Sequence, residues 1–98
     1  PYYRMVYVYL KNRNETLLYM MAHTMAEKLR ALFGNRILGP DKPPVARIQT
    51  LFIRKIVVKI EQNAPMSRAR ELLLRVQREM IEDERFKSLI VYYDVDPM

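Results

Sequence analysis

Two stretches of the chain have the alternating pattern of β-strands. Residues 3–10 are rich in β-branched and aromatic side chains, and Val6, Val8 and Leu10 share one face because successive side chains of a strand point to opposite sides. The other face carries tyrosines and a methionine, so this strand is predicted to be central in its sheet. The second strand covers residues 51–60, and its more apolar face carries Phe52, Ile56, Val58 and Ile60.

Apolar residues recur at helical spacing after each of these strands. The first helix is expected to begin at Asn14, whose side chain can accept a backbone N–H of the first turn, and to end at Gly34. The second is expected over residues 66–84, directly after Pro65. The residues predicted to be buried on the two helices are Leu17, Leu18, Met21, Ala22, Met25, Leu29, Leu32, Phe33, Ala69, Leu72, Leu73, Val76, Met80 and Ile81.

The remaining segments are shorter. Residues 36–45 contain three prolines, which cannot donate to a sheet ladder, so this segment is predicted to be an irregular edge strand with a bulge, or a loop. A turn is expected at residues 48–50, and a last strand over residues 86–95.

The resulting order of elements is β-α-β-β-α-β. It predicts the α+β class and a ferredoxin-like (split βαβ) sandwich, in which a four-stranded antiparallel sheet carries two helices on one face. Right-handed crossovers would place the first and third strands in the centre and the proline-rich strand at an edge. We expect one domain over residues 1–98, and the start at Pro1 rather than at Met suggests a piece of a longer protein.

Charge and composition narrow the function. The chain carries 17 Lys and Arg against 11 Asp and Glu, and its net charge of +6 favours a polyanionic partner. It has no cysteine, one histidine (His23) and no phosphate-binding glycine loop, so neither catalysis nor a cofactor or metal is expected in this chain. No apolar run reaches the length of a membrane span, so no membrane contact is expected. Asp94 and Asp96 would share a strand face, and we interpret them as a strand end that meets solvent or a basic side chain.

Aromatic and basic side chains are the candidates for binding. Tyr3, Tyr7 and Tyr9 share one face of the first strand, and Tyr93 is expected to join them. Aromatic residues on an open sheet face can stack nucleic-acid bases or dock on a protein. Basic residues gather on the second and third strands and on the second helix, whose first turns favour an anion.

Several short motifs occur in an order that resembles a known family. Ile37-Leu38-Gly39-Pro40 precedes a proline-rich stretch ending in Pro44-Val45-Ala46-Arg47, and the basic strand after it is followed by Ser67-Arg68-Ala69-Arg70 and Asp94-Val95-Asp96-Pro97. Together with the opening Pro1-Tyr2-Tyr3, these motifs span nearly the whole chain. The chain thus resembles the C-terminal domain of the PriA family (primosomal protein N-prime).

The resemblance implies a function and partners. The chain would be the C-terminal domain of an ATP-dependent 3′-to-5′ DNA helicase that acts in replication restart and primosome assembly, in the bacterial cytoplasm at the nucleoid. Its partners would be forked or single-stranded DNA, the helicase core of the same parent chain, and the acidic C-terminal tail of single-stranded DNA-binding protein (SSB). ATP, magnesium and zinc would belong to other domains of the parent.

The resemblance also implies site residues. Arg68 matches the arginine that faces the SSB-tail pocket, and Leu72 lies one helical turn further on. The third strand departs from the family's alternation of arginine and aromatic residues, since Leu51 and Ile53 are uncharged. The residues expected to contact DNA or a partner are Arg68, Arg70, Leu72, Arg47, Lys59, Lys42, Arg54 and Phe52.

Two other functions fit the residues. The first is an RNA-binding ferredoxin-like domain of the ribosomal-protein type, which a preference for folded RNA over forked DNA would indicate. The second is a protein–protein interaction domain whose tyrosine face docks on another protein, which absent or salt-insensitive DNA binding would indicate.

Overall fold

The sheet is built on two long central strands. In the computed structural model, which describes residues 3–97, β1 (Tyr3–Asn12) pairs antiparallel with β4 (Leu51–Glu61). β2 (Ile37–Asp41) pairs with β4 and β5 (Ile90–Val95) pairs with β1, which gives the order β2-β4-β1-β5. A two-residue strand, β3 (Arg47–Ile48), also pairs with β4. The Pro1-Tyr2 start of the family resemblance lies outside the described residues.

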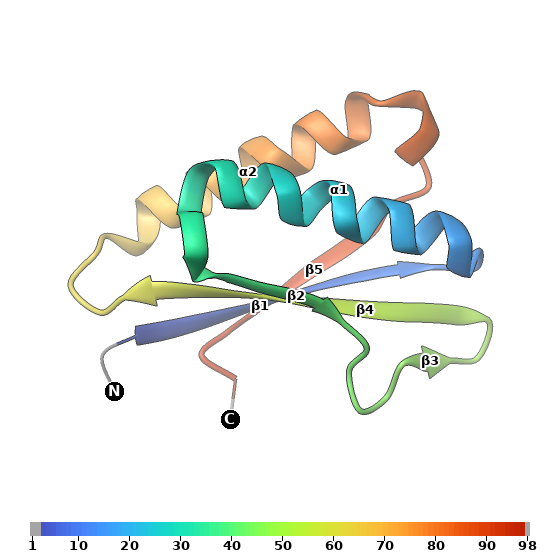
Figure 1. Cartoon of the computed structure of the whole chain (residues 1–98), viewed down its shortest axis with the longest axis horizontal. Helices are drawn as coiled ribbons and strands as arrows, with labels where there is room; N and C mark the ends of the chain where they lie inside the picture. The colour runs from blue at the N-terminus through green and yellow to red at the C-terminus, as the bar shows by residue number, and fades with distance from the viewer. Residues whose placement is uncertain (1–2, 98) are drawn as a thin grey trace.

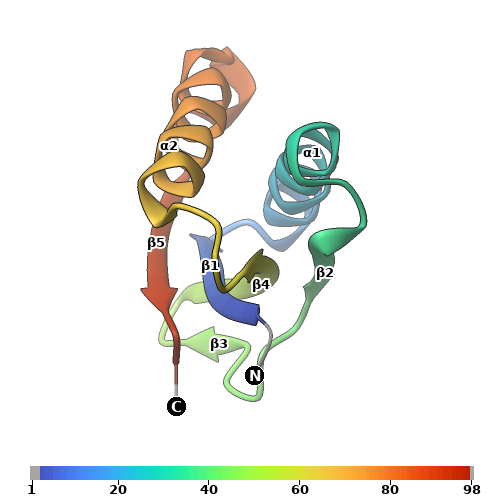
Figure 2. The ribbon, with the colours of Figure 1, turned by 90° about the vertical axis from the view of Figure 1, so that its left-hand side faces the viewer.

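Both long helices lie on the same side of the sheet (Figures 1 and 2). They are α1 (Glu15–Phe33) and α2 (Met66–Glu82), and each is followed by a short 3₁₀ turn, η1 (Gly34–Arg36) and η2 (Glu84–Phe86). The predicted α+β class, the ferredoxin-like arrangement and the two central strands are confirmed; the short strand β3 was not predicted.

The core lies between the helices and the sheet. Alternate residues of β1 and β4 are buried there, as the sequence pattern predicted. The main helix residues in this core are Leu18, Met21, Ala22, Met25, Leu29, Ala69, Leu73, Val76 and Met80. Two predicted core residues are instead exposed, Leu32 at 36% and Ile81 at 45%. Ile81 follows the buried Met80 by one residue and is therefore rotated about 100° away from the core, and Leu32 lies in the last turn of its helix.

The predicted ends of the first helix are confirmed. The Asn14 side chain accepts the backbone N–H of Leu17 at 3.0 Å, and Gly34 ends the helix with a φ of 65°. The start of the last strand was predicted wrongly, because Phe86 belongs to η2 and the strand begins only at Ile90. The Asp83 carboxylate accepts the backbone N–H of Arg85 at 3.0 Å, which closes a turn that places Phe86 in the core.

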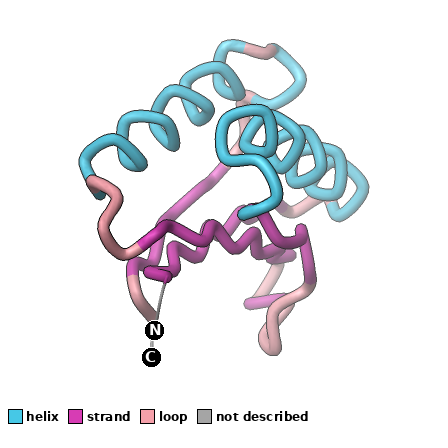
Figure 3. Tube along the Cα trace, turned by 60° about the vertical axis from the view of Figure 1, so that its left-hand side comes forward, coloured by secondary structure: helices cyan, strands magenta, loops and turns pink. Residues whose placement is uncertain are grey.

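The proline-containing strand β2 is an edge strand with a bulge, as predicted. Its register against β4 shifts between Leu38 and Asp41, where Gly39 has a φ of 98°. Arg30 of α1 donates to the Gly39 carbonyl at 2.6 Å and ties the bulge to the helix layer. The loop between β2 and β3 then extends to the side of the sheet away from the helices (Figure 3).

The first and last described strands are joined at one corner. The Arg4 guanidinium donates to one carboxylate oxygen of Asp96 at 2.8 and 2.9 Å. Asp96 also exchanges hydrogen bonds with the Met5 backbone, at 2.7 and 3.1 Å. Asp96 lies beyond β5 with a φ of 50°, so it does not share a strand face with Asp94. The interpretation of Asp96 as a strand end that meets a basic side chain is confirmed.

Candidate nucleic-acid interface

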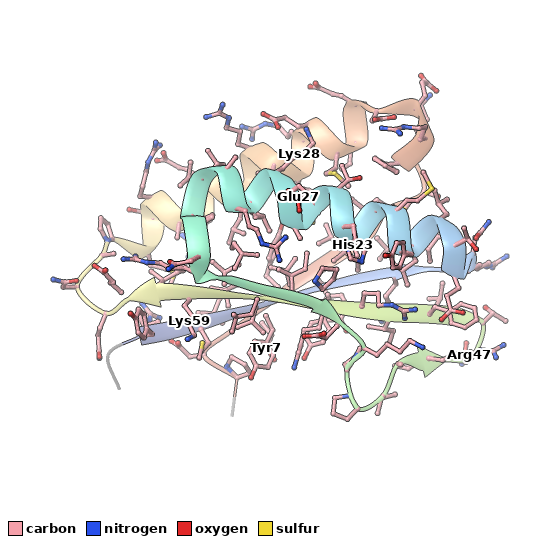
Figure 4. All side chains as sticks on the ribbon, viewed as in Figure 1. Tyr7, His23, Glu27, Lys28, Arg47 and Lys59 are labelled. Atoms are coloured by element: carbon pink, nitrogen blue, oxygen red, sulfur yellow. The ribbon has the colours of Figure 1, made fainter. Side chains whose placement is uncertain are left out.

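The sheet face turned away from the helices carries alternating tyrosines and lysines. The pairing of β1 with β4 and β5 sets Tyr9 opposite both Lys55 and Tyr92. Figure 4 shows Tyr7 on the side of the sheet opposite to His23 and Glu27 of α1. We define the open face as Tyr3, Met5, Tyr7, Tyr9, Lys11, Lys55, Val57, Lys59, Glu61, Ile90, Tyr92 and Asp94.

Each lysine of the open face lies over a tyrosine ring. The ammonium of Lys55 is 4.3 Å from the centroid of the Tyr7 ring, and that of Lys11 is 4.8 Å from the Tyr92 ring. Lys59 lies 5.4 Å from the ring of Tyr3. Contacts of this kind contribute about 0.5–1 kcal/mol at exposed sites. These contacts hold the three ammonium groups close to the sheet.

The two central rings of the open face stack on each other. Tyr9 and Tyr92 lie nearly parallel, at 15°, with their centroids 4.8 Å apart, and the Tyr7 ring meets Tyr9 at 70° and 6.3 Å. Partial burial, the neighbouring phenols and the carboxylate of Asp94 raise the pKa of Tyr9. The phenol of Tyr9 therefore stays neutral near pH 7 and adds no negative charge to the face.

Tyr93 does not belong to this face, and the prediction that it would was wrong. It pairs with Val8, whose side chain is in the core, so Tyr93 points toward α2. Its hydroxyl donates to the Gln77 side chain at 2.8 Å, and burial raises its pKa to about 12. Tyr92 occupies the position on the open face that was expected for Tyr93.

Ion pairs neutralise the helix side of the molecule more than the open face. Nine of the 17 lysines and arginines have a carboxylate partner, including Lys28, Arg30 and Arg75 of the helices. Within residues 3–97, the cations without such a partner are Lys11, Arg13, Lys42, Arg47, Lys55, Lys59, Arg70 and Arg78. The three lysines of the open face are all in this group. Three of the eight cations without a carboxylate partner in residues 3–97 therefore lie on the side of the sheet that the helices do not cover.

Three predicted contact residues lie near one end of β4. Arg47 of β3 is exposed, and its guanidinium lies 4.9 Å from the ring centroid of Phe52. Arg54 alternates with Ile56 and Val58 toward the helices and is only 7% exposed. Its guanidinium donates to the Glu15 carboxylate at 2.8 Å and to the Ile53 carbonyl, so we leave Arg54 out of the interface.

The predicted residues of α2 lie on the helix side, in two separate places. Arg68 and Leu72 line a shallow pocket of about 110 Å³ together with Phe33 and Arg36. Arg68 also pairs with Glu71 at 3.1 Å. Arg70 lines a different pocket of about 200 Å³, between α2 and β5. Arg68 and Arg70 therefore do not form one anion site.

The last predicted residue, Lys42, lies at the β2 edge. It lines a pocket of about 250 Å³ together with His23, Asp41 and Arg54. His23 is exposed, and the centroid of its ring lies 4.1 Å from that of Tyr19, with the two rings tilted by 38°. Residues 3–97 contain no group of three His, Cys, Asp or Glu side chains placed to hold a metal ion.

Of the open face, Lys59 was a predicted contact, and Tyr3, Tyr7 and Tyr9 were named as binding candidates. Lys11, Lys55 and Tyr92 were not among the predicted contacts. Lys11 lies beyond the predicted end of the first strand. Tyr92 could be placed on the open face only once the register of β5 against β1 was known. The alternation that continues from Tyr7 and Tyr9 to Lys11 is the signal that could have identified Lys11.

Comparisons with known proteins bear on the fold. No protein-family model and no curated protein matches the chain. Among solved structures, the chain is similar to one titled "De novo designed protein Foldit4", with a TM-score of 0.67, 10% sequence identity and coverage of 98% of each chain. At this identity the similarity supports the ferredoxin-like fold alone. No helix in the described part of the chain is long and apolar enough to cross a membrane.

Proposed function

We propose that this chain is a DNA-binding and protein-docking domain of the PriA type, from the C-terminal part of a bacterial replication-restart helicase. The order of motifs along the chain supports this parentage. The observation that carries the DNA-binding part is that Lys11, Lys55 and Lys59 rest on tyrosine rings of a helix-free sheet face. Within the part of the chain that the structure describes, these lysines have no carboxylate partner. The domain acts by binding, and ATP hydrolysis belongs to the remainder of the parent protein.

The binding mechanism is neutralisation of phosphates. A lysine that meets a phosphate releases a condensed counterion, so the affinity falls as salt rises, in proportion to the number of phosphates neutralised. Lys42 and Arg47 are also exposed and form no ion pair with the residues between 3 and 97, and they extend this charge along the β2–β3 segment. The paired arginines of the helices contribute less, because local carboxylates already offset their charge.

Protein docking is proposed for the pocket at the start of α2. Its apolar lining includes Phe33 and Leu72, and the basic residues that line it are Arg36, Lys59 and Arg68. An acidic peptide that ends in an apolar residue, such as the SSB tail, matches this combination through a charge-assisted hydrogen bond from a guanidinium. Most of the Arg68 side chain, 64%, is exposed and accessible to such a peptide.

Fluorescence anisotropy with a labelled forked DNA tests the DNA-binding part. The double variant Lys55→Ala/Lys59→Ala should bind several-fold more weakly than the wild-type chain and show a salt slope smaller by about 1–2. The matched control Lys28→Ala/Lys87→Ala removes the same charge from ion-paired positions on the helix side. Equal losses in the two double variants would show that only net charge matters. A preference for a folded RNA of equal length would favour the ribosomal-type alternative.

Calorimetry with the SSB tail peptide tests the docking part, and it uses the parent helicase, in which the helicase core implied as a partner of this chain is present. Arg68→Ala should weaken tail binding, and Arg85→Ala, an exposed arginine paired with Asp83 outside this pocket, should not. If Arg68→Ala binds the tail peptide with unchanged affinity, Arg68 does not contact the tail.

A further inference from the structure

We propose that the open face is a base-stacking site for single-stranded DNA, in which a base replaces a lysine over a tyrosine ring and the displaced lysine moves to the adjacent phosphate. This inference rests on the proposed DNA-binding function and names the form of DNA that the face selects. The rings concerned are those of Tyr7, Tyr92 and Tyr3.

The ring geometry determines where a base can bind. Tyr9 and Tyr92 stack at 4.8 Å, so no base fits between them. Lysines lie over the rings of Tyr7 and Tyr92, at 4.3 and 4.8 Å. A base that stacks on the lysine-covered face of either ring therefore has to displace the ammonium group.

The exchange is favourable because both partners improve their contacts. Base stacking on an aromatic side chain is stronger than an ammonium–ring contact at an exposed site. The released ammonium stays within one side-chain length of the base that replaced it, where the phosphate of the same nucleotide offers a full negative charge. The lysine thus exchanges a weak ring contact for an ion pair.

Charge favours nucleic acid over an ordinary protein surface as the occupant. Lys11, Lys55 and Lys59 have no carboxylate partner among residues 3–97. The acids of the face are Asp94 and Glu61, and Glu61 is paired with Arg36. A neutral protein partner would have to bury three ammonium groups without compensation. Unpaired bases are required as well, because the base faces of a duplex are already covered by neighbouring pairs.

The test compares ligands of equal phosphate number on the 98-residue chain. These are a labelled oligothymidine of about 12 nucleotides, which is within the site sizes of single-domain binders, an abasic oligonucleotide of the same length, a matched duplex and a matched oligouridine. The oligothymidine should bind about tenfold more tightly than the abasic strand. The duplex should bind no more tightly than the abasic strand.

Ring variants identify the stacking positions. Tyr7→Leu and Tyr92→Leu should each reduce oligothymidine affinity about tenfold and leave abasic affinity unchanged, whereas Tyr7→Phe and Tyr92→Phe should keep both. Tyr19→Leu is the control, since Tyr19 is 57% exposed on α1, away from the open face. Circular dichroism confirms that each variant is folded.

A measurement on the wild-type chain needs no variant. The Lys55 ammonium lies 4.3 Å from the centroid of the Tyr7 ring, so the protons on the adjacent Cε should be shifted upfield in the proton NMR spectrum. Oligothymidine should remove this shift, and the abasic strand should leave most of it.

If oligothymidine and the abasic strand bind equally, and the leucine variants change neither affinity, base stacking is wrong while DNA binding stands. If the wild-type chain binds none of the four ligands but does bind an acidic protein, both this inference and the DNA-binding part of the proposed function fail. Equal binding of oligouridine would extend the site to RNA, and much tighter oligouridine binding would overturn the assignment to DNA.

Discussion

The guanidinium of Arg54 and the carboxylate of Glu15 meet at 2.8 Å, which joins a central strand to the first turn of α1. The hydrogen bond from Arg54 lowers the pKa of Glu15 from its ordinary value of 4.5, despite some burial of the carboxyl group. Because the folded-state pKa is depressed, the pair stabilises the fold above pH 4.5, and this stabilisation is lost as the pH falls through the folded-state value.

Glu15→Gln should therefore lower the melting temperature at pH 7 and change it much less at pH 3. Thermal unfolding followed by circular dichroism at the two pH values measures this difference. Glu27→Gln is the control, because Glu27 is paired with Arg30 on an exposed helix surface. A loss in Glu15→Gln that is equal at both pH values would contradict an ionic role.

Asp94→Asn should tighten the binding of single-stranded DNA. Asp94 lies opposite Tyr7 on the open face and has no cationic partner in the described residues. Removing its charge should raise affinity by about two- to fivefold at low salt, and the gain should shrink as salt screens the interaction. Glu82→Gln makes the same charge change at the end of α2 and should have a smaller effect. An equal gain from both variants would show that DNA does not approach Asp94 specifically.

Tyr93→Phe should destabilise the fold and leave DNA affinity unchanged. It removes the 2.8 Å hydrogen bond to Gln77, a loss of about 1 kcal/mol in the free energy of unfolding. Tyr92→Phe removes an exposed hydroxyl and should leave stability unchanged. Urea denaturation of the two variants makes the comparison, and equal stabilities would contradict the assignment of these neighbours to opposite faces.

Alkaline titration should distinguish Tyr93 from the other tyrosines. Its pKa is raised from 10.0 to about 12 by burial, so its neutral form favours the folded state. That stabilisation is complete below pH 10 and is lost as the pH rises toward 12. In difference spectra of phenol ionisation, the Tyr93→Phe variant should lack the last ionising tyrosine. Ionisation of all tyrosines near pH 10 would contradict the burial of Tyr93.

Gly39→Ala should destabilise the domain more than Gly34→Ala. Both glycines have positive φ, but a β-carbon at Gly39 would lie 2.9 Å from the Lys55 carbonyl, whereas one at Gly34 would meet nothing within 4 Å. Positive φ alone costs a non-glycine residue about 1–3 kcal/mol, and the collision at Gly39 adds to this. Chemical denaturation measures both losses. Equal losses would show that the bulge adjusts without moving β4.

Local patterns predicted most of this fold. The alternation of Val6, Val8 and Leu10 identified a central strand, and Asn14 and Gly34 marked the ends of α1 through their own backbone chemistry. These signals lie within a few residues of the feature they predict, so they could be interpreted without the tertiary structure.

Features that depend on partner strands could not be predicted in the same way. Whether Tyr92 or Tyr93 faces the core depends on the register of β5 against β1, which the turn around Phe86 sets. Arg54 is different, because its alternation with Ile56 did indicate the core side. Its charge suggested a ligand contact instead, and the partner that allows its burial, Glu15, is 39 residues away.

The corner at which Arg4 holds Asp96 also determines how the domain responds to tension. Because β1 and β5 are antiparallel, the start of one strand lies beside the end of the other. A pull applied through residues 4 and 96 would load the bonds between the strands one after another, as in a zipper, rather than all together. The Arg4–Asp96 pair is the first bond that such a pull meets, so its rupture would begin the peeling of β5 from the sheet.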